Sequence, residues 1–103
     1  MENNMLTSPL PKRLKEARQA MGLSQKSLGI KAGIDEFSAS TRMNQYETGK
    51  YSPDYLSLKN IAAVLNVPTA YFYAENDQLA QMIKLFNTLK KSDRTLLLKQ
   101  LQK

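Results

Sequence analysis

The chain has 103 residues and a mass of 11.7 kDa, which is enough for one compact domain and too little for a large multi-domain enzyme. It contains no histidine and no cysteine, so disulfides, imidazole or thiolate metal sites and nucleophile–histidine catalysis are excluded. Fifteen Lys and Arg residues against nine Asp and Glu residues give a net charge of +6, which favours an anionic partner.

Targeting signals are absent from the sequence pattern. The first eight residues carry no basic segment followed by an apolar one, as a secretory leader would. The longest apolar stretch, Ile61 to Leu65, is far shorter than the roughly 20 residues that a membrane helix needs. We therefore expect a soluble, cytoplasmic protein that binds no membrane, no metal ion and no cofactor.

Apolar residues that recur every three or four positions predict the first helices. After an irregular arm over residues 1–9, where proline disfavours regular structure, Leu14, Ala17 and Met21 predict a helix over 12–21 that Gly22 ends. Ser24 is a suitable N-cap for a short second helix over 25–32.

A turn and a third helix follow. Residues 33–39 mix apolar and acidic side chains, and we expect Ile34 and Phe37 to tuck against the core. The next helix, over 40–47, is expected to bury Met43 and Tyr46 and to end at Gly49.

The second half of the chain also has helical periodicity. The cluster at 52–54 opens a helix that ends at Asn66, with an apolar stripe formed by Leu56, Leu58, Ile61, Ala62 and Leu65. A brief helix over 69–73 is expected to close the core with Tyr71, Phe72 and Tyr73. No segment alternates with the period of a strand, so the predicted fold class is all-α.

Two amphipathic helices are predicted at the C-terminal end. Asp77 is expected to cap the first, whose apolar residues are Leu79, Met82, Ile83, Phe86 and Leu89. Ser92 is expected to cap the second, which carries Leu96, Leu97, Leu98 and Leu101. The net charge is +3 over residues 1–53 (eight basic, five acidic), −1 over 54–76 (one, two) and +4 over 77–103 (six, two), so both ends of the chain are basic.

Two blocks of residues follow one another in a characteristic order. The first is Gly22–Leu23–Ser24–Gln25 with Leu28 and Lys31–Ala32–Gly33–Ile34, and the second is Tyr46–Glu47–Thr48–Gly49–Lys50 with Pro53, Leu58, Ile61–Ala62, Leu65 and Val67. Together they resemble the lambda-repressor-like, Xre/Cro-type helix-turn-helix family. The resemblance implies a five-helix DNA-binding domain over residues 10–76, in which the second and third helices bind DNA. A helical C-terminal extension over 77–103 follows it. Its leucine-rich stripe is expected either to pack back on the domain or to serve as a dimerisation segment.

The turn before the third helix departs from the family pattern. A helix-turn-helix turn has about 3–4 residues, whereas residues 33–39 number seven here. Counting back from Glu47 and Gly49 places the recognition helix at Ser40 to Glu47, while counting forward from Gly33 would put Asp35 to Ser38 at the DNA groove. We adopt the first alignment because Glu47 and Gly49 belong to the helix itself.

In this alignment a set of polar side chains lies on the exposed face of the recognition helix. Such side chains can pair with base edges in the major groove, and the alternative is an ordinary solvated helix face. The predicted base contacts are Ser40, Thr41, Arg42, Asn44 and Gln45. The predicted phosphate contacts are Gln25, Lys26, Lys50, Lys12 and Arg13. The resemblance further implies that Arg18 and Glu47 form a structural pair across the first and third helices.

Three classes of function compete. The leading one is a sequence-specific double-stranded DNA-binding transcriptional regulator, which we expect to be a repressor and a homodimer on a palindromic operator. The alternative is an antitoxin-like or adaptor protein whose C-terminal helices bind a protein partner. An enzyme is the least favoured class, because the only candidate catalytic groups are scattered carboxylates such as Asp35 and Glu36. No oriented base stands beside them in the sequence.

Overall fold

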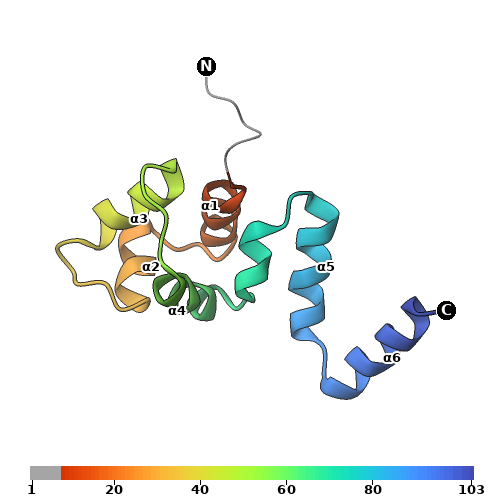
Figure 1. Ribbon diagram of the computed structural model, residues 1–103. Helices are drawn as coiled ribbons and strands as arrows, with labels where there is room; N and C mark the ends of the chain where they lie inside the picture. Colours follow the sequence, from red (N-terminus) through yellow and green to blue (C-terminus); the bar gives the residue numbers. More distant parts are fainter. Residues whose placement is uncertain (1–7) are drawn as a thin grey trace.

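The computed structural model describes residues 8–103, and every regular element within that range is a helix (Figure 1). The helices are α1 (Leu10–Ala20), α2 (Gln25–Lys31), α3 (Ala39–Thr48), α4 (Tyr55–Leu65), the short 3₁₀ helix η2 (Thr69–Tyr73), α5 (Asp77–Thr88) and α6 (Lys91–Leu101). The prediction of an all-α fold is confirmed. Most of the arm expected over residues 1–9 lies outside the described residues.

Local signals in the sequence set several helix ends as predicted. The Ser24 hydroxyl caps α2 by accepting a hydrogen bond from the Ser27 N–H at 3.0 Å. Gly49 and Asn66 end α3 and α4 in the left-handed conformation, with φ of 81° and 58°. Both residue types tolerate that conformation better than most others do, because glycine lacks a Cβ and the asparagine side chain can bond locally.

Four helix starts differ from the prediction, and one of them, that of α3, lies at Ala39, one residue before the predicted Ser40. α1 begins at Leu10, two residues early, because a proline such as Pro11 is tolerated in the first turn, where its missing N–H has no helical partner. Asn76, and not Asp77, caps α5, since the Asn76 side chain accepts from the Leu79 N–H at 2.8 Å. α6 begins at Lys91 without a side-chain cap, so Ser92 already lies inside the helix.

The core forms where α1 to α4 and η2 meet. Its fully buried side chains are Phe72, Leu14, Leu28, Met43, Leu58 and Ile61. Tyr71 and Phe72 close it with an edge-to-face ring contact whose centroids are 5.4 Å apart. Met43 and Tyr46 face the core as predicted.

Two aromatic or aliphatic residues expected in the core are outside it. Tyr73 is 52% exposed, because a 3₁₀ helix has three residues per turn and cannot turn three consecutive side chains inward. Leu56 is 65% exposed, since the buried face of α4 carries Leu58, Ile61 and Leu65 and Leu56 projects from the opposite side.

Phe37 is the largest departure from the predicted core. Ile34 packs against the core as expected, but Phe37 is 95% exposed at the α2–α3 turn. The Asp35 carboxylate accepts hydrogen bonds from the N–H groups of Phe37 and Ser38, at 2.9 and 3.2 Å. These bonds close a tight turn that leads straight into α3 and leaves the phenyl ring outside.

α2 and α3 approach each other closely at the ends that the turn connects. A Cβ added to Gly29 would lie 2.8 Å from the Ala39 Cβ and 3.0 Å from the Ala39 carbonyl oxygen. Both residues are buried. The absence of a side chain at Gly29 therefore sets the distance between the two helices.

Arg13 joins α1 to the start of α5. Its side chain is 5% exposed, and its Nε and Nη2 donate to the Ala74 carbonyl at 3.1 and 3.0 Å, while Nη1 donates to Asp77 at 2.8 Å. The Arg13 hydrogen bond, together with the nearby charge of Lys12, lowers the pKa of the Asp77 carboxyl. Arg13 therefore links two parts of the fold from inside the protein.

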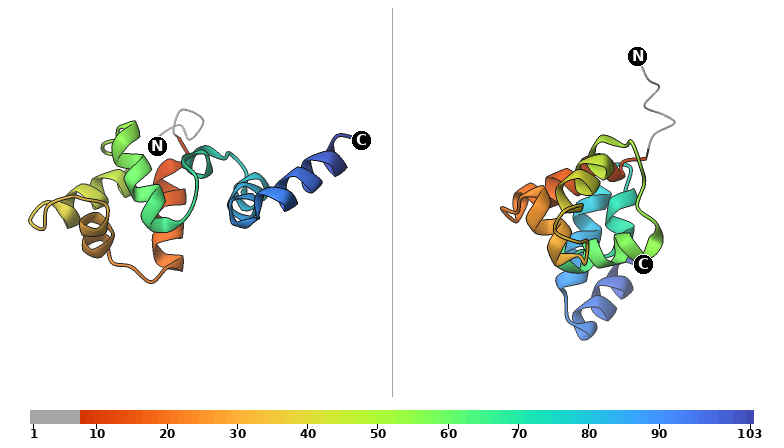
Figure 2. Two further views of the ribbon diagram at one scale, coloured as in Figure 1. Left: turned by 90° about the horizontal axis from the view of Figure 1, so that it is seen from below. Right: turned by 90° about the vertical axis from the view of Figure 1, so that its left-hand side faces the viewer.

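The last helix leaves the rest of the molecule. α5 keeps Ala80 buried, but α6 has no buried residue and extends away from the core (Figure 1, Figure 2). The radius of gyration is 15.1 Å, whereas a compact domain of about this length has roughly 13 Å. No helix in residues 8–103 has the length and apolar character to span a membrane.

The contact between α2 and α3 gives a test of the fold. Replacing Gly29 by Ala is expected to lower the free energy of unfolding, because overpacking costs about 1–3 kcal/mol against a gain in helix propensity of about 1 kcal/mol. Urea unfolding followed by circular dichroism measures the change. Lys31→Ala, an exposed change on the same helix, is the control and should leave stability near that of the wild type. Equal stability of the two variants would contradict the close approach.

Candidate nucleic-acid interface

α3 presents one polar face to solvent. Its buried face carries Ala39, Met43 and Tyr46. The five predicted base-contact residues all lie off this face: Ser40, Thr41, Arg42 and Asn44 are exposed, and Gln45 is half-buried. With 3.6 residues per turn, Thr41, Asn44 and Gln45 occupy the side opposite the core, while Ser40 and Arg42 lie on its two flanks.

Thr48 also lies on this outer face, although it is not one of the predicted base contacts. Its hydroxyl donates to the Gln45 carbonyl at 3.3 Å, and the residue is exposed. The spacing of seven residues from Thr41 was the signal that would have identified it, because residues two turns apart share a face. The outer face of α3 thus carries four polar side chains, which are Thr41, Asn44, Gln45 and Thr48.

An ion pair attaches α3 to α1. The Arg18 Nε and Nη2 donate to the two carboxylate oxygens of Glu47, at 2.6 and 3.0 Å, and Arg18 Nη1 donates to the Leu23 carbonyl at 2.8 Å. The side chains are 12% and 3% exposed. The structure therefore brings together the two residues that the family resemblance pairs, in the bidentate geometry that fixes orientation most strongly.

Gln25 extends this network to the outer face of α3. Its Nε2 donates to Glu47 Oε1 at 3.1 Å and to Asn44 Oδ1 at 3.2 Å. The side-chain donors that would meet a phosphate are thus engaged within the protein. The structure gives Gln25 a role that the sequence did not predict, which is to orient Asn44.

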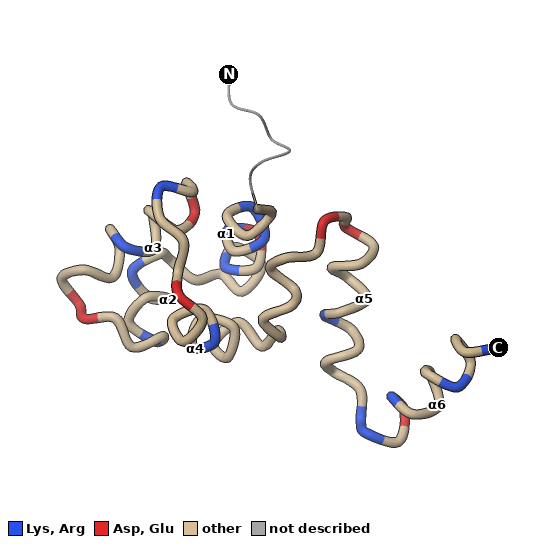
Figure 3. The backbone as a smooth tube through the Cα atoms, viewed as in Figure 1, with Lys and Arg blue, Asp and Glu red and all other residues tan. Residues whose placement is uncertain are grey.

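Basic side chains lie on the elements next to α3 in the chain. Lys26 and Lys50 are exposed, and the Lys50 Nζ lies 5.8 Å from the centre of the Tyr51 ring. Figure 3 shows basic positions on α2, on α3 and just after α3. Lys12 is also exposed, with its Nζ 4.0 Å from Asp77. Arg13 is a correction, because its guanidinium is buried and bound to Ala74 and Asp77, so it is not available to a phosphate.

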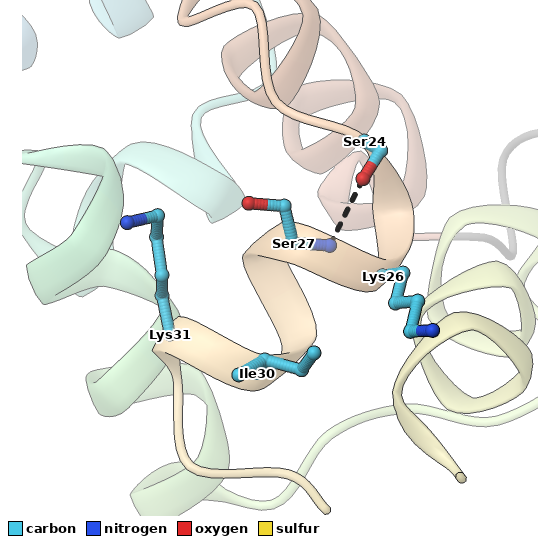
Figure 4. Close-up of a pocket in the computed structure, with 5 residues that line it drawn as sticks. All are labelled: Ser24, Lys26, Ser27, Ile30 and Lys31. Atoms are coloured by element: carbon cyan, nitrogen blue, oxygen red, sulfur yellow. Dashed lines mark hydrogen bonds between the residues drawn. The ribbon is translucent and has the colours of Figure 1, made fainter. Parts of the chain in front are cut away.

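A shallow hollow lies on the outer side of α2 (Figure 4). It is lined by Ser24, Lys26, Ser27, Ile30 and Lys31. Lys26 extends on the side of α3 and Lys31 on the opposite side. The first turn of α2 therefore offers a lysine and a helix start close to the α3 face.

Asp35 has a structural role that was not predicted from the sequence. The hydrogen bonds from Ser38 and from the Phe37 N–H lower the pKa of its carboxyl, as does the charge of Arg42. The signal was available, because an aspartate that precedes a helix start by a few residues commonly bonds backbone N–H groups of a turn. Asp35 thus holds the turn that precedes α3.

The comparisons with known proteins agree with this geometry. A family model described as helix-turn-helix matches residues 14–72, which include the whole of α2 and α3. Among solved structures, the transcriptional regulator BswR is similar, with 44% sequence identity, a TM-score of 0.83 and coverage of 90% of this chain and 92% of that chain. A comparison with curated proteins gives no match.

The family match spans more than half of the chain, and the similar structure covers nearly all of it. The matched residues include the α1–α3 ion pair and the exposed face of α3. The chain belongs to the lambda-repressor-like, Xre/Cro-type helix-turn-helix family.

Proposed function

We propose that the protein is a sequence-specific regulator of transcription that binds double-stranded DNA, reads the major groove with α3 and acts as a repressor. The observation that carries the proposal is the set of hydrogen bonds that Arg18, Glu47 and Gln25 form between helices. These bonds fix the orientation of α3, and therefore of its outer face, relative to α1 and α2. Membership of the helix-turn-helix family and the similarity to a transcriptional regulator support it. Repression follows most simply, because a protein that occupies an operator excludes others from the same DNA.

Base readout is assigned to the first turns of α3. Thr41 and Gln45 lie one turn apart, so they reach neighbouring base pairs when the helix enters the groove N-terminus first. The Gln45 amide suits adenine, whose N6 and N7 offer a donor and an acceptor. Because Asn44 Oδ1 accepts from Gln25, its Nδ2 is directed to an acceptor such as a purine N7. Ser40 and Arg42 flank this set and complete the base-contact residues.

Phosphate contacts are assigned to exposed basic groups on α1, on α2 and just after α3. Lys26 and Lys50 stand on either side of it along the chain, and Lys12 is exposed at the start of α1. Gln25 takes part through its backbone N–H, because the first N–H groups of a helix lack intrahelical partners. These groups position the protein on the duplex without selecting a sequence.

The C-terminal helices are assigned to pairing with a second copy of the chain. Their largest exposed apolar side chains are Leu79, Met82 and Leu85 on α5 and Leu96, Leu98 and Leu101 on α6. The other three residues of the predicted α5 stripe, Ile83, Phe86 and Leu89, are half-buried. A group of exposed apolar side chains such as this one is typical of an interface. A twofold dimer would present two copies of α3 about 34–36 Å apart, one DNA turn, which suits a palindromic operator.

Base readout is tested by replacing Gln45 with Ala. The variant is expected to lose about 1–3 kcal/mol of binding free energy on the preferred site and to relax the preference at one position in each half-site. Affinity for non-specific duplex should stay nearly unchanged. Selection from a random DNA pool, followed by titration of the selected duplexes, measures both quantities. Asn60→Ala, an exposed amide change on α4, is the control, and identical preferences for the two variants would contradict the assignment.

The phosphate contacts are tested by the salt dependence of binding. Each phosphate that is neutralised contributes about −0.9 to the slope of log K against log salt. Lys50→Ala is therefore expected to reduce the slope by roughly one unit and to weaken all sequences alike. The matched control is Lys59→Ala, a change at an exposed lysine of α4. A slope that Lys50→Ala leaves unchanged would remove this residue from the contact set.

Self-association is tested with charge placed on α6. Leu96→Glu is expected to convert a dimer to a monomer in sedimentation velocity at micromolar concentration, because a buried unpaired carboxylate opposes association. Leu56→Glu, at a residue of similar exposure on α4, should leave the dimer intact. A wild-type protein that stays monomeric with and without operator DNA would contradict this assignment. It would favour the alternative, in which this surface binds a different protein.

A further inference from the structure

Phe37 is an aromatic side chain that the fold does not use. It is 95% exposed, more than any other large hydrophobic residue in the described chain. Burial of a phenyl ring is one of the larger apolar gains open to a protein. The residue nevertheless stands only two positions before Ala39, the first residue of α3.

The turn holds the backbone of Phe37 in place with its side chain on the outside. Phe37 and Ser38 donate their N–H groups to the Asp35 carboxylate, and the Ser38 N–H also lies 3.1 Å from the Asp35 carbonyl. Upstream, Ile34 packs on the core and donates its N–H to the Gly29 carbonyl at 2.9 Å. Downstream, Ala39 is fully buried against Gly29. Both ends of the turn are therefore anchored, so the exposure of Phe37 is a property of the fold.

The position of the turn determines which part of the DNA the Phe37 ring can contact. When α3 enters the major groove N-terminus first, the residues just before it lie at the edge of the same groove. Glu36, the residue before Phe37, disfavours a position against the phosphate backbone, because like charges repel. The apolar feature that the groove offers is the thymine methyl group.

Resting on the proposed function, we infer that Phe37 is a specificity-determining residue that packs on a thymine methyl group at the edge of the site read by α3. The longer turn then extends the reading surface by one apolar contact beyond the first turn of the helix. Asp35 is its positioning residue. Phe37 would select for thymine through an apolar contact with the methyl group and not through a hydrogen bond.

A methyl deletion in the DNA tests this contact directly. The duplex is the preferred site selected by the wild-type protein, with each thymine replaced in turn by deoxyuridine, which lacks only the methyl group. One replacement is expected to weaken wild-type binding about fourfold, which corresponds to the burial of one methyl group. Phe37→Ala should bind the thymine duplex as weakly as the wild type binds that uracil duplex, and should not distinguish the two. Its thermal stability should match the wild type, since the ring is exposed.

A fluorescent probe reports the same contact independently. The chain contains no tryptophan, so Phe37→Trp introduces a single reporter. Its emission is expected to shift, and its quenching by iodide to fall, when the preferred duplex is added. Tyr73→Trp, at the exposed residue of η2, serves as the control and should show neither change.

The outcomes separate this inference from the function on which it rests. If the wild type binds its selected duplex while no uracil replacement matters to it more than to Phe37→Ala, the role of Phe37 is overturned and the DNA-binding function stands. If the indole of the Phe37→Trp variant becomes shielded without DNA as protein concentration rises, the side chain contacts another copy of the chain, and the inference is again wrong. If the wild type binds no duplex at all, the proposed function fails and this contact fails with it.

Discussion

The buried pair of Arg18 and Glu47 is the constraint on which the candidate interface depends. A carboxylate that is only 3% exposed is costly unless its charge is matched, and the bidentate guanidinium matches it in one geometry only. The pair therefore fixes the rotation of α3 about its own axis as well as its distance from α1. Gln25, bonded to the same carboxylate, carries that orientation to Asn44 on the outer face. The buried hydrogen-bond network is thus connected directly to the exposed polar face of α3.

The long turn between α2 and α3 is compatible with this fixed orientation, because its extra residues lie outside the contact between the two helices. At the base of the turn, Gly29 and Ala39 bring the two helices into near backbone contact. The added residues then fold over the Asp35 carboxylate rather than separating the helices. The extra residues therefore do not hold the two helices apart, and they carry an exposed aromatic ring just before α3.

The N-terminal and C-terminal parts of the molecule differ in how their apolar side chains are covered. From α1 to η2 the chain packs a core within itself, with Phe72 and Ile61 fully inaccessible. α5 is joined to that core through Arg13 and Asp77, and α6 buries nothing. The exposed leucines of α5 and α6 gain stability only against another surface. The basic charge of this segment opposes non-specific association while the surface is uncovered.

The sequence by itself determined the features that depend on neighbours along the chain. Apolar periodicity identified the helices and the buried face of α3 through Met43 and Tyr46, and Ser24, Gly49 and Asn66 set three helix ends by local hydrogen bonding and backbone conformation. The tertiary structure alone decided the rest. Arg13 is buried because the Ala74 carbonyl lies 61 residues away in sequence and adjacent in space. Phe37 is exposed because the turn closes on Asp35, and the donors of Gln25 are used because Glu47 and Asn44 are brought beside it by the packing of α2 on α3. Local patterns reveal which side chains are polar or apolar, but only contacts between distant residues decide which of them remain free to bind.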